Sequence, residues 1–288
     1  MELIDKLILG TVQFGLNYGI NNLEGKPTGK DVFEILDLAS EQNIETLETA
    51  NAYGDAIELI GLYHQQKKHL FKILSKFKNV KAGELYDLTQ HSLNKLHIPY
   101  FEVYSYHSFA DYLKHPYLND ELLLLKSKGL IKKIGISVYT NKELQLVIHD
   151  KTIDVIQLPY NLLDNQNRRG AYLEQAKPNN KEIHVRSVFL QGLFFMNEGS
   201  IPEKLIPLEP YIREIHSFCK KEAITIQALA LSYAIYNKQI DHVLIGVENS
   251  SQLRKNIESI SDLKSAFDYI NQHINVKEKE LLNPVNWK

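Results

Sequence analysis

Four residues whose side chains could together protonate a carbonyl oxygen follow short apolar runs of the sequence. Glu48 and Tyr53 lie in Glu-Thr-Ala-Asn-Ala-Tyr-Gly, Lys76 lies in Ser-Lys-Phe, and His107 ends Tyr-Ser-Tyr-His. Reduction of an aldehyde or ketone places a hydride on carbon and a proton on oxygen, so an acid must stand beside a nicotinamide cofactor. These residue types therefore indicate a site for carbonyl reduction.

Tyr53 is the candidate acid. A tyrosine hydroxyl ordinarily has a pKa near 10, and the ammonium group of a neighbouring Lys76 would lower that pKa toward neutrality. A carboxylate from Glu48 would keep Lys76 charged and oriented. His107 would direct an N–H at the carbonyl oxygen and so position the substrate relative to Tyr53. Taken singly, each residue is more often a packed or solvated side chain, and only their shared position after successive strands favours a site.

Eight short apolar runs alternate with longer segments of helical period, which is typical of parallel strands joined by crossover helices. The predicted strands span 7–12, 45–48, 71–76, 102–106, 133–137, 155–158, 182–189 and 242–245. Predicted helices span 32–41, 56–66, 85–96, 120–128, 142–149, 226–236 and 252–260, and long loops are expected at 177–181 and 197–210. The sequence therefore predicts an α/β chain folded as a (β/α)8 TIM barrel, with residues 1–288 in a single domain.

A TIM barrel carries its chemistry at the carboxyl ends of its strands. The four candidate residues lie at or just after the ends of the second, third and fourth predicted strands, so fold and chemistry agree. An open doubly wound sheet is the alternative architecture. No G-x-G-x-x-G follows the first strand, and residues 10–15 lack the Lys-Ser/Thr of a phosphate-binding loop, so the barrel is favoured.

Composition and charge restrict the partners. The chain has 288 residues with a net charge of −2, which provides no global field to attract nucleic acid or an anionic membrane. No apolar stretch approaches the roughly 20 residues of a membrane-spanning helix, and the acidic Glu2 does not fit a signal peptide. A single cysteine, Cys219, matches a reducing compartment. We expect a cytoplasmic protein whose partner is a small molecule, with no nucleic acid and no membrane as partner.

A metal site is not expected from the sequence. His115, His184 and His242 show no metal-ligand spacing, and the sequence contains no H-E-x-x-H. One cysteine also excludes a cysteine-based metal cluster.

The motifs around the candidate residues resemble those of the aldo-keto reductase family. Glu-Thr-Ala-x-x-Tyr-Gly, Ser-Lys-Phe and Tyr-Ser-Tyr-His are similar to the tyrosine, lysine and histidine motifs of that family. Segments 9–15, 133–137, 155–161, 186–193 and 245–256 are similar to its first, fifth, sixth, seventh and eighth strands with their loops. The resemblance implies a (β/α)8 barrel that binds NADPH or NADH in an extended form without a Rossmann motif.

The resemblance also implies which residues hold the cofactor. Gly10 and Thr11 belong to the segment that is similar to the family's opening strand. Ser137 and Gln157 would hold the nicotinamide carboxamide, and residues 187–193 would contact the pyrophosphate. The other implied cofactor residues are Arg186, Ser187, Leu190 and Gly192, followed by Gly246, Glu248, Gln252 and Asn256 around the adenosine end.

Three positions depart from the family pattern. Glu48 stands where the family usually has aspartate, and a displacement of about 1 Å in a catalytic site can cost on the order of 100-fold in rate. Val138 follows Ser137 where asparagine is common. Arg186 occupies a position where an aromatic side chain often stacks on the nicotinamide, and a guanidinium plane can stack as well.

The adenosine loop carries mixed signals and indicates tolerance of NADH beside NADPH. Gly246 and Gln252 are uncharged where some family members have a lysine and an arginine, and Glu248 would repel a 2′-phosphate. Arg254 and Lys255 could supply positive charge nearby.

The sequence thus indicates an NAD(P)H-dependent reductase acting on the carbonyl of an aldehyde, ketone or keto sugar, with Tyr53 as proton donor. Segments 10–19 and 283–287 resemble bacterial family members associated with surface-polysaccharide sugar metabolism. Two alternatives remain open. The chain could be a cofactor-binding regulatory or interaction subunit with an impaired site, for which Glu48 and Val138 are the support, or a sugar epimerase or lyase that uses the same residues.

Overall fold

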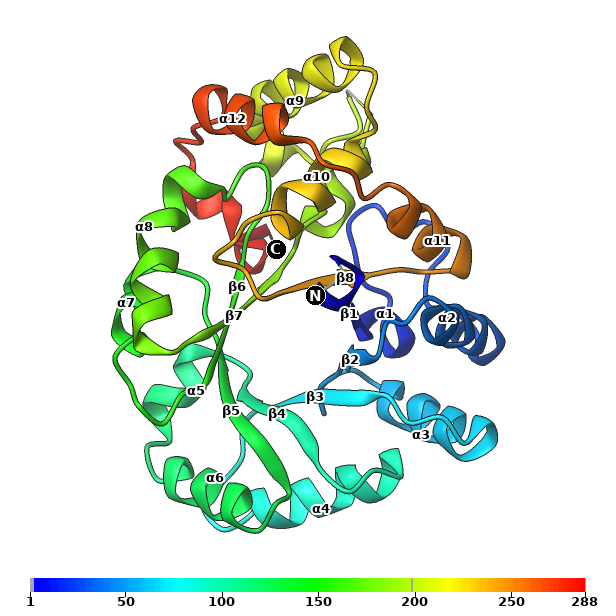
Figure 1. Ribbon diagram of the computed structural model, residues 1–288, viewed down its shortest axis with the longest axis vertical. Coiled ribbons are helices and arrows are strands. Elements are labelled where there is room, and N and C mark those ends of the chain that lie inside the picture. Colours follow the sequence, from blue (N-terminus) through cyan, green and yellow to red (C-terminus); the bar gives the residue numbers. More distant parts are fainter. Residues whose placement is uncertain (1–2, 198, 288) are drawn as a thin grey trace.

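The structure is a computed structural model that describes residues 3–197 and 199–287. Within them, eight parallel strands close into a barrel in which each strand pairs with the next and β8 pairs with β1 (Figure 1). The strands are β1 (Leu7–Gly10), β2 (Thr46–Glu48), β3 (Lys72–Phe77), β4 (Phe101–Tyr106), β5 (Ile131–Ser137), β6 (Val155–Pro159), β7 (Glu182–Arg186) and β8 (His242–Gly246). The predicted (β/α)8 fold is confirmed.

Helices surround the barrel on its outside (Figure 1). They are α1 (Val12–Gly15), α2 (Gly29–Glu41), α3 (Ala56–Lys67), α4 (Leu85–Leu96), α5 (Phe109–Lys114), α6 (Leu118–Ser127), α7 (Asn141–Val147), α8 (Gln166–Ala176), α9 (Glu209–Lys221), α10 (Ile226–Ile235), α11 (Ser250–Glu258) and α12 (Lys264–His273). Short 3₁₀ segments are η1 (Leu3–Lys6), η2 (Lys177–Asn179), η3 (Leu190–Phe195), η4 (Glu203–Leu208), η5 (Lys279–Leu282) and η6 (Pro284–Trp287). Within the described residues, no helix is both long enough and apolar enough to cross a membrane.

Every predicted strand and helix is present, with shifted ends. The first strand stops at Gly10 because α1 begins at Val12, and the seventh stops at Arg186 because Ser187 has a φ of +60°, which a strand cannot continue through. The long loops expected at 177–181 and 197–210 are partly wrong, since η2 lies in the first, and η4 and the start of α9 lie in the described part of the second. The α9 helix forms because it buries one apolar side, including Ile212 and Ile215, against the rest of the protein.

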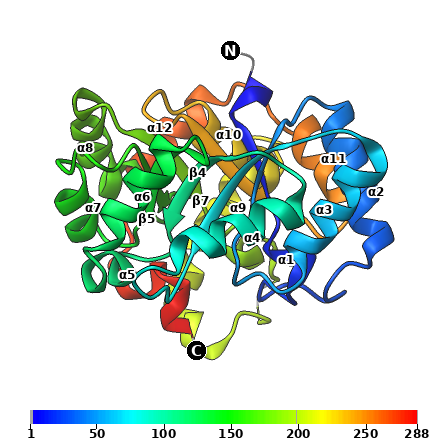
Figure 2. The same cartoon turned by 90° about the horizontal axis from the view of Figure 1, so that it is seen from below.

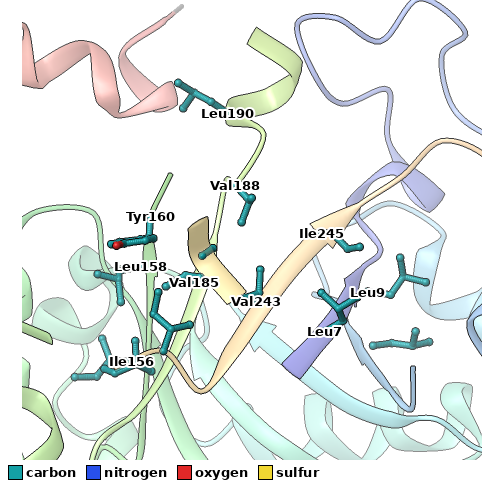
Figure 3. Packing of buried hydrophobic residues seen from close by; sticks show 14 of the residues in the cluster. Leu7, Leu9, Ile156, Leu158, Tyr160, Val185, Val188, Leu190, Val243 and Ile245 are labelled. Atoms are coloured by element: carbon teal, nitrogen blue, oxygen red, sulfur yellow. The ribbon is translucent and has the colours of Figure 1, made fainter. Parts of the chain in front are cut away.

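Strand side chains alternate between the outside and the inside of the barrel wall. Residues such as Leu9, Ile156 and Val185 belong to the large core cluster, part of which Figure 3 shows. A separate small cluster consists of Ile8, Leu74, Val103, Val155 and Leu244. Successive side chains of a strand face opposite sides, so the residues two positions further along share the interior face: Gly10, Lys76, Ser105, Gln157 and Gly246. The small apolar cluster inside the barrel thereby fixes which residues face the interior at the carboxyl end of the strands.

The first and last described elements lie at opposite ends of the barrel axis (Figure 2). The segment η1 lies at the end where the parallel strands begin, and η6 lies at the end where they finish. The predicted catalytic residues belong to this second end.

Candidate active site

Glu48 and Lys76 form a buried ion pair at the carboxyl ends of β2 and β3. Glu48 Oε1 and Lys76 Nζ are in contact, and the two side chains are only 5% and 6% exposed. Thr11 fixes the backbone of Glu48, because its amide and its hydroxyl both donate to the Glu48 carbonyl oxygen, at 2.9 and 3.0 Å. Gln157 Oε1 accepts a hydrogen bond of 3.3 Å from Lys76 Nζ. The glutamate therefore reaches the lysine in spite of its extra methylene.

Tyr53 is positioned by a tight contact between two turns. The turn after β2 approaches the end of α1 so closely that a Cβ on Gly54 would lie 2.3 Å from the Gly15 carbonyl oxygen, and one on Gly15 would lie 1.7 Å from the Tyr53 carbonyl oxygen. Gly54 also has a φ of +53°, which glycine adopts at little cost. The amide of Asn51 donates to the Lys76 carbonyl oxygen at 3.3 Å. These contacts hold Tyr53 beside Lys76.

Tyr53, Lys76 and His107 lie together at the rim of the barrel. Lys76 Nζ is 5.3 Å from the centroid of the Tyr53 ring. The ring centroids of Tyr53 and His107 are 6.0 Å apart, with planes 87° to each other. The His107 amide donates to the Phe77 carbonyl oxygen at 3.0 Å, which continues the pairing of β3 with β4. The structure therefore brings the four predicted catalytic residues into one group.

The Tyr53 hydroxyl is protonated at neutral pH. Burial raises the pKa of Tyr53 to about 12, the Glu48 carboxylate adds to this rise, and Lys76 acts in the opposite direction. The prediction that Lys76 brings this pKa toward neutrality is wrong, because burial removes the water that would stabilise the phenolate. A protonated phenol is nevertheless the form that can give a proton to a carbonyl oxygen.

The neighbours of Tyr53 have shifted pKa values of their own. Burial lowers the pKa of Lys76, but Glu48 and Tyr53 together outweigh burial, so the pKa is raised and the ammonium form persists. Burial, followed by the charge of Lys76, lowers the pKa of His107 to about 3. A neutral imidazole offers one N–H donor and one acceptor nitrogen. His107 Nδ1 is buried and has no hydrogen-bond partner among the described residues. His107 does not itself line the cavity beside Tyr53.

A cavity of 390 Å³ opens beside Glu48, Tyr53 and Lys76. Most of the predicted cofactor residues line it, namely Gly10, Arg186, Ser187, Gly192, Gly246, Glu248, Gln252 and Asn256. Four others lie outside the lining, namely Thr11, Ser137, Gln157 and Leu190.

The four residues outside the lining are buried. Thr11 is bound to the Glu48 backbone, and Leu190 is fully buried in the apolar core. Ser137 lies opposite Gln157 in the pairing of β5 with β6. The contacts of Ser137 and Gln157 with a nicotinamide carboxamide stay a prediction.

Arg186 stacks on Tyr139, which follows β5. The Arg186 Cζ atom is 4.2 Å from the Tyr139 ring centroid, and Nη1 makes a long hydrogen bond of 3.4 Å to Ser187 Oγ. Arg186 Nη2 is buried and lacks a hydrogen-bond partner within the described part of the chain. A buried donor left in this way costs free energy, so the site suits a ligand that accepts a hydrogen bond there.

The loop after β8 holds a carboxylate at the cavity. Glu248 Oε2 accepts from Gln252 Nε2, and the Glu248 amide donates to Gln252 Oε1, both at 2.9 Å. Asn249 caps α11 by accepting from the Gln252 amide at 2.9 Å. Arg254 and Lys255, which could have supplied positive charge, are exposed and do not line the cavity. The part of the cavity formed by the loop after β8 is therefore acidic rather than basic.

The sequence analysis assigned no individual site residue to the loop that follows α1. Its Ile20 amide donates to the Gln191 carbonyl oxygen at 3.1 Å, and Gln191 Nε2 donates to the Tyr18 hydroxyl at 3.1 Å. This loop and the loop after β7 thus meet across the cavity. The lining residues without a predicted role include Gln13, Tyr18, Asn21, Phe189, Gln191, Phe195 and Gln227. Gln13, Phe189 and Gln191 had a signal, since they lie inside the family-like segments 9–15 and 186–193, whereas Asn21, Phe195 and Gln227 lie outside them.

The residues of the cavity fit a nicotinamide dinucleotide. Arg186 Nη2 and Gln13 Oε1 are both buried without partners among the described residues, and both belong to residues that line the cavity. A cofactor with phosphate oxygens and amide N–H groups offers partners for both. Glycine is the only residue that this part of the cavity wall accepts at position 246 without a shift, because a Cβ there would lie 2.5 Å from Gln13 Oε1.

Comparisons with known proteins agree with this geometry. The sequence model of the Aldo/keto reductase family matches residues 6–274. The NADH-specific methylglyoxal reductase of Escherichia coli (strain K12) is 22% identical over 222 residues, which are 70% of this chain and 68% of that protein. An aldo-keto reductase from Bacillus halodurans in its holo form shares the fold with a TM-score of 0.71 at 17% identity, over 95% of each chain. A glycerol dehydrogenase from Gluconobacter oxydans does so with a TM-score of 0.72 at 16% identity, over 97% of this chain and 93% of its own.

The family match extends from η1 to the residue after α12 and so includes every strand of the barrel and all four predicted catalytic residues. The chain therefore belongs to the aldo/keto reductase family and is an NAD(P)-dependent oxidoreductase.

Proposed function

We propose that this protein reduces the carbonyl group of a small aldehyde, ketone or keto sugar, with Tyr53 as the proton donor and NADH as the preferred cofactor. The observation that carries the proposal is the buried pair of Lys76 and Glu48 beside the protonated Tyr53, at the edge of the cavity. An ammonium held in this position would stabilise the phenolate that remains after the proton has moved.

Each residue has one task in the proposed reaction. When bound, the nicotinamide cofactor supplies the hydride for the carbonyl carbon. Tyr53 would give its proton to the carbonyl oxygen, and Lys76 would stabilise the charge left on Tyr53. Glu48 would hold Lys76 in place. Neutral His107 would donate an N–H to the carbonyl oxygen and so orient the substrate.

Arg186 would support the nicotinamide ring. One face of its guanidinium plane is against Tyr139, and a stacked guanidinium can offer its other face to a flat ring. The free Nη2 would donate to a cofactor or substrate oxygen. Ser187, Gly192 and Gly10 line the cavity and would be close to the pyrophosphate and nicotinamide.

NADH is preferred because of Glu248. Gln252 fixes its carboxylate at the cavity, where it would accept hydrogen bonds from ribose hydroxyls and would repel a 2′-phosphate. The NADH-specific E. coli relative supports this choice. We retain keto sugars of surface-polysaccharide metabolism among the candidate substrates, and a cytoplasmic location, since Cys219 is a free buried thiol.

Loss of NADH and NADPH absorbance with methylglyoxal, other small aldehydes and keto sugars tests the proposal. Tyr53→Phe should lower kcat/KM on the order of 100- to 10,000-fold, because the acid is removed, while NADH still binds by fluorescence. Tyr112→Phe is the matched control, since it removes a phenol that binds Asp150 away from the site. Turnover that survives in Tyr53→Phe would overturn Tyr53 as the donor. Binding of both cofactors without consumption of either would favour the regulatory or epimerase alternatives.

A further inference from the structure

A second cavity opens at the other end of the barrel, where the strands begin. It has a volume of 610 Å³ and is lined by residues from η1 and from the first parts of most strands. Its charged lining groups are the carboxylates of Asp5, Glu45, Glu102 and Glu182 and the ammonium groups of Lys72 and Lys133. Three of these carboxylates are paired with lysines, namely Glu45 with Lys72, Glu102 with Lys132 and Glu182 with Lys133.

Three side chains that can ligate a metal meet in this cavity. Glu182 and His184 come from β7, and His242 comes from β8. One ligand atom from each lies within 4.8 Å of the other two. The two histidines face each other because β7 and β8 pair with His184 opposite His242, and their ring centroids are 4.9 Å apart.

The spacing of the donor atoms suits one ion. Glu182 Oε1 is 2.8 Å from His184 Nε2 and 3.7 Å from His242 Nε2. Ligands about 2.1 Å from a tetrahedral Zn²⁺ stand roughly 3.4 Å from one another. Small side-chain rotations would therefore bring all three donors onto one ion, and the cavity leaves room for a water as the fourth ligand.

The surroundings of the three side chains resemble the outer partners of metal ligands. Lys133 Nζ pairs with Glu182 Oε2, which leaves Oε1 facing the two imidazoles. Such a partner orients a ligating carboxylate without occupying its other oxygen. His242 Nδ1 is buried and has no hydrogen-bond partner among the described residues.

We propose that Glu182, His184 and His242 bind one divalent transition-metal ion, with Zn²⁺ the best match to two imidazoles and a carboxylate. The ion would join β7 to β8 and so brace the mouth of the barrel, where residues serve stability rather than catalysis. The sequence analysis did not expect this site, because no metal-ligand spacing exists along the chain and the ligands meet only when β7 pairs with β8.

Zinc titration of the chelator-treated full chain tests the proposal. Calorimetry should show one equivalent of Zn²⁺ bound. Thermal unfolding should shift upward by several degrees at roughly 100-fold excess over Kd, because the ion binds only the folded state. His242→Gln should weaken binding by at least about 10-fold and remove the shift. His91→Gln, a change at an exposed residue of α4, should leave both unchanged.

Co²⁺ gives a second readout, because its visible absorption reports the ligands directly and needs no change in stability. The wild type should develop this absorption, and Glu182→Gln, whose fold is checked by circular dichroism, should lose it. NADH turnover should be the same with and without metal, since the site lies at the far end of the barrel. A wild type that binds neither ion, or a His242→Gln variant that binds Zn²⁺ as tightly as the wild type, would overturn the proposal.

Discussion

Glu48 Oε1 is bound to Lys76 Nζ inside the barrel, and neither side chain is more than 6% exposed. An ion pair so deeply buried contributes little net stability when intact, because removing both charges from water offsets their attraction. Its value lies in geometry, since it fixes the ammonium 5.3 Å from the Tyr53 ring centroid.

Glu48→Gln should be damaging in two ways. It leaves a buried ammonium without its carboxylate, which should lower the free energy of unfolding by about 3–5 kcal/mol. It should also lower kcat/KM by roughly 100-fold, because Lys76 loses its fixed position. Urea unfolding and NADH oxidation measure the two effects.

Glu48→Asp separates the reductase from the impaired-subunit alternative. The charge is kept and the reach is shortened by one methylene, so we expect a rate at or below that of the wild type, because Glu48 already contacts Lys76. A large gain in kcat would mean that the natural glutamate impairs the site, contrary to our reading.

Gly54→Ala should displace the turn that carries Tyr53. Its Cβ would lie 2.3 Å from the Gly15 carbonyl oxygen, so one of two backbones must move. We expect a stability loss of about 2–3 kcal/mol and a fall in kcat with little change in cofactor affinity.

The matched control for this prediction is Gly129→Ala. Gly129 also has a positive φ, of +72°, but a Cβ there would meet nothing within 4 Å. The Gly129→Ala substitution should lower the free energy of unfolding only by the backbone strain, about 1–2 kcal/mol, and should leave kcat unchanged. Equal effects of the two variants on kcat would contradict the role of the Gly15 contact.

The strands could be predicted because they are short runs of apolar residues, some of which alternate with polar ones. Eight such runs separated by segments of helical period indicate a barrel. The α8 helix could not be predicted in this way, because its buried side includes Arg169, which pairs with Asp164 at 2.6 Å inside the protein. A pattern search counts such a residue as exposed. The α9 helix, in contrast, had a readable pattern in Ile212, Ile215 and Phe218 that the sequence analysis did not use.

The sequence predicted which residues form the candidate site, but it did not predict the pKa shifts and hydrogen bonds among them. Strand ends and family-like motifs identified Tyr53, Lys76 and His107. The direction of the Tyr53 pKa shift depends on how much water is removed from the hydroxyl, and sequence does not contain that quantity. The bond from Thr11 to the Glu48 carbonyl oxygen likewise depends on the register of β1 beside β2. That residues 1–288 form one domain stays a prediction.

Glu248→Arg should shift the cofactor preference. The carboxylate that repels a 2′-phosphate is replaced by a cation that can bind it, so the ratio of kcat/KM for NADPH to that for NADH should rise at least about 10-fold. Glu258→Arg, the same charge change at the other end of α11, is the control and should leave the ratio unchanged. An unaltered ratio in Glu248→Arg would show that this loop does not select the cofactor.

Acid should destabilise the protein through His107. Its pKa is about 3 in the folded protein and roughly 6.5 in an unfolded chain. The unfolded state therefore binds more protons between these values, and the contribution of His107 to stability is complete above about pH 6.5 and is lost as the pH falls. The free energy of unfolding should fall by about 1.4 kcal/mol for each pH unit below the pKa of the unfolded state. At about pH 5 the total loss should therefore be about 2 kcal/mol.

His107→Gln tests this pH dependence, because an amide keeps an N–H donor but does not titrate. Urea unfolding at about pH 7.5 and about pH 5 should show a smaller loss of stability in the variant than in the wild type. His91→Gln removes an exposed imidazole and should lose as much stability as the wild type. Equal losses in wild type and His107→Gln would mean that folding does not lower the pKa of His107, and the pH dependence assigned here to its burial would be wrong.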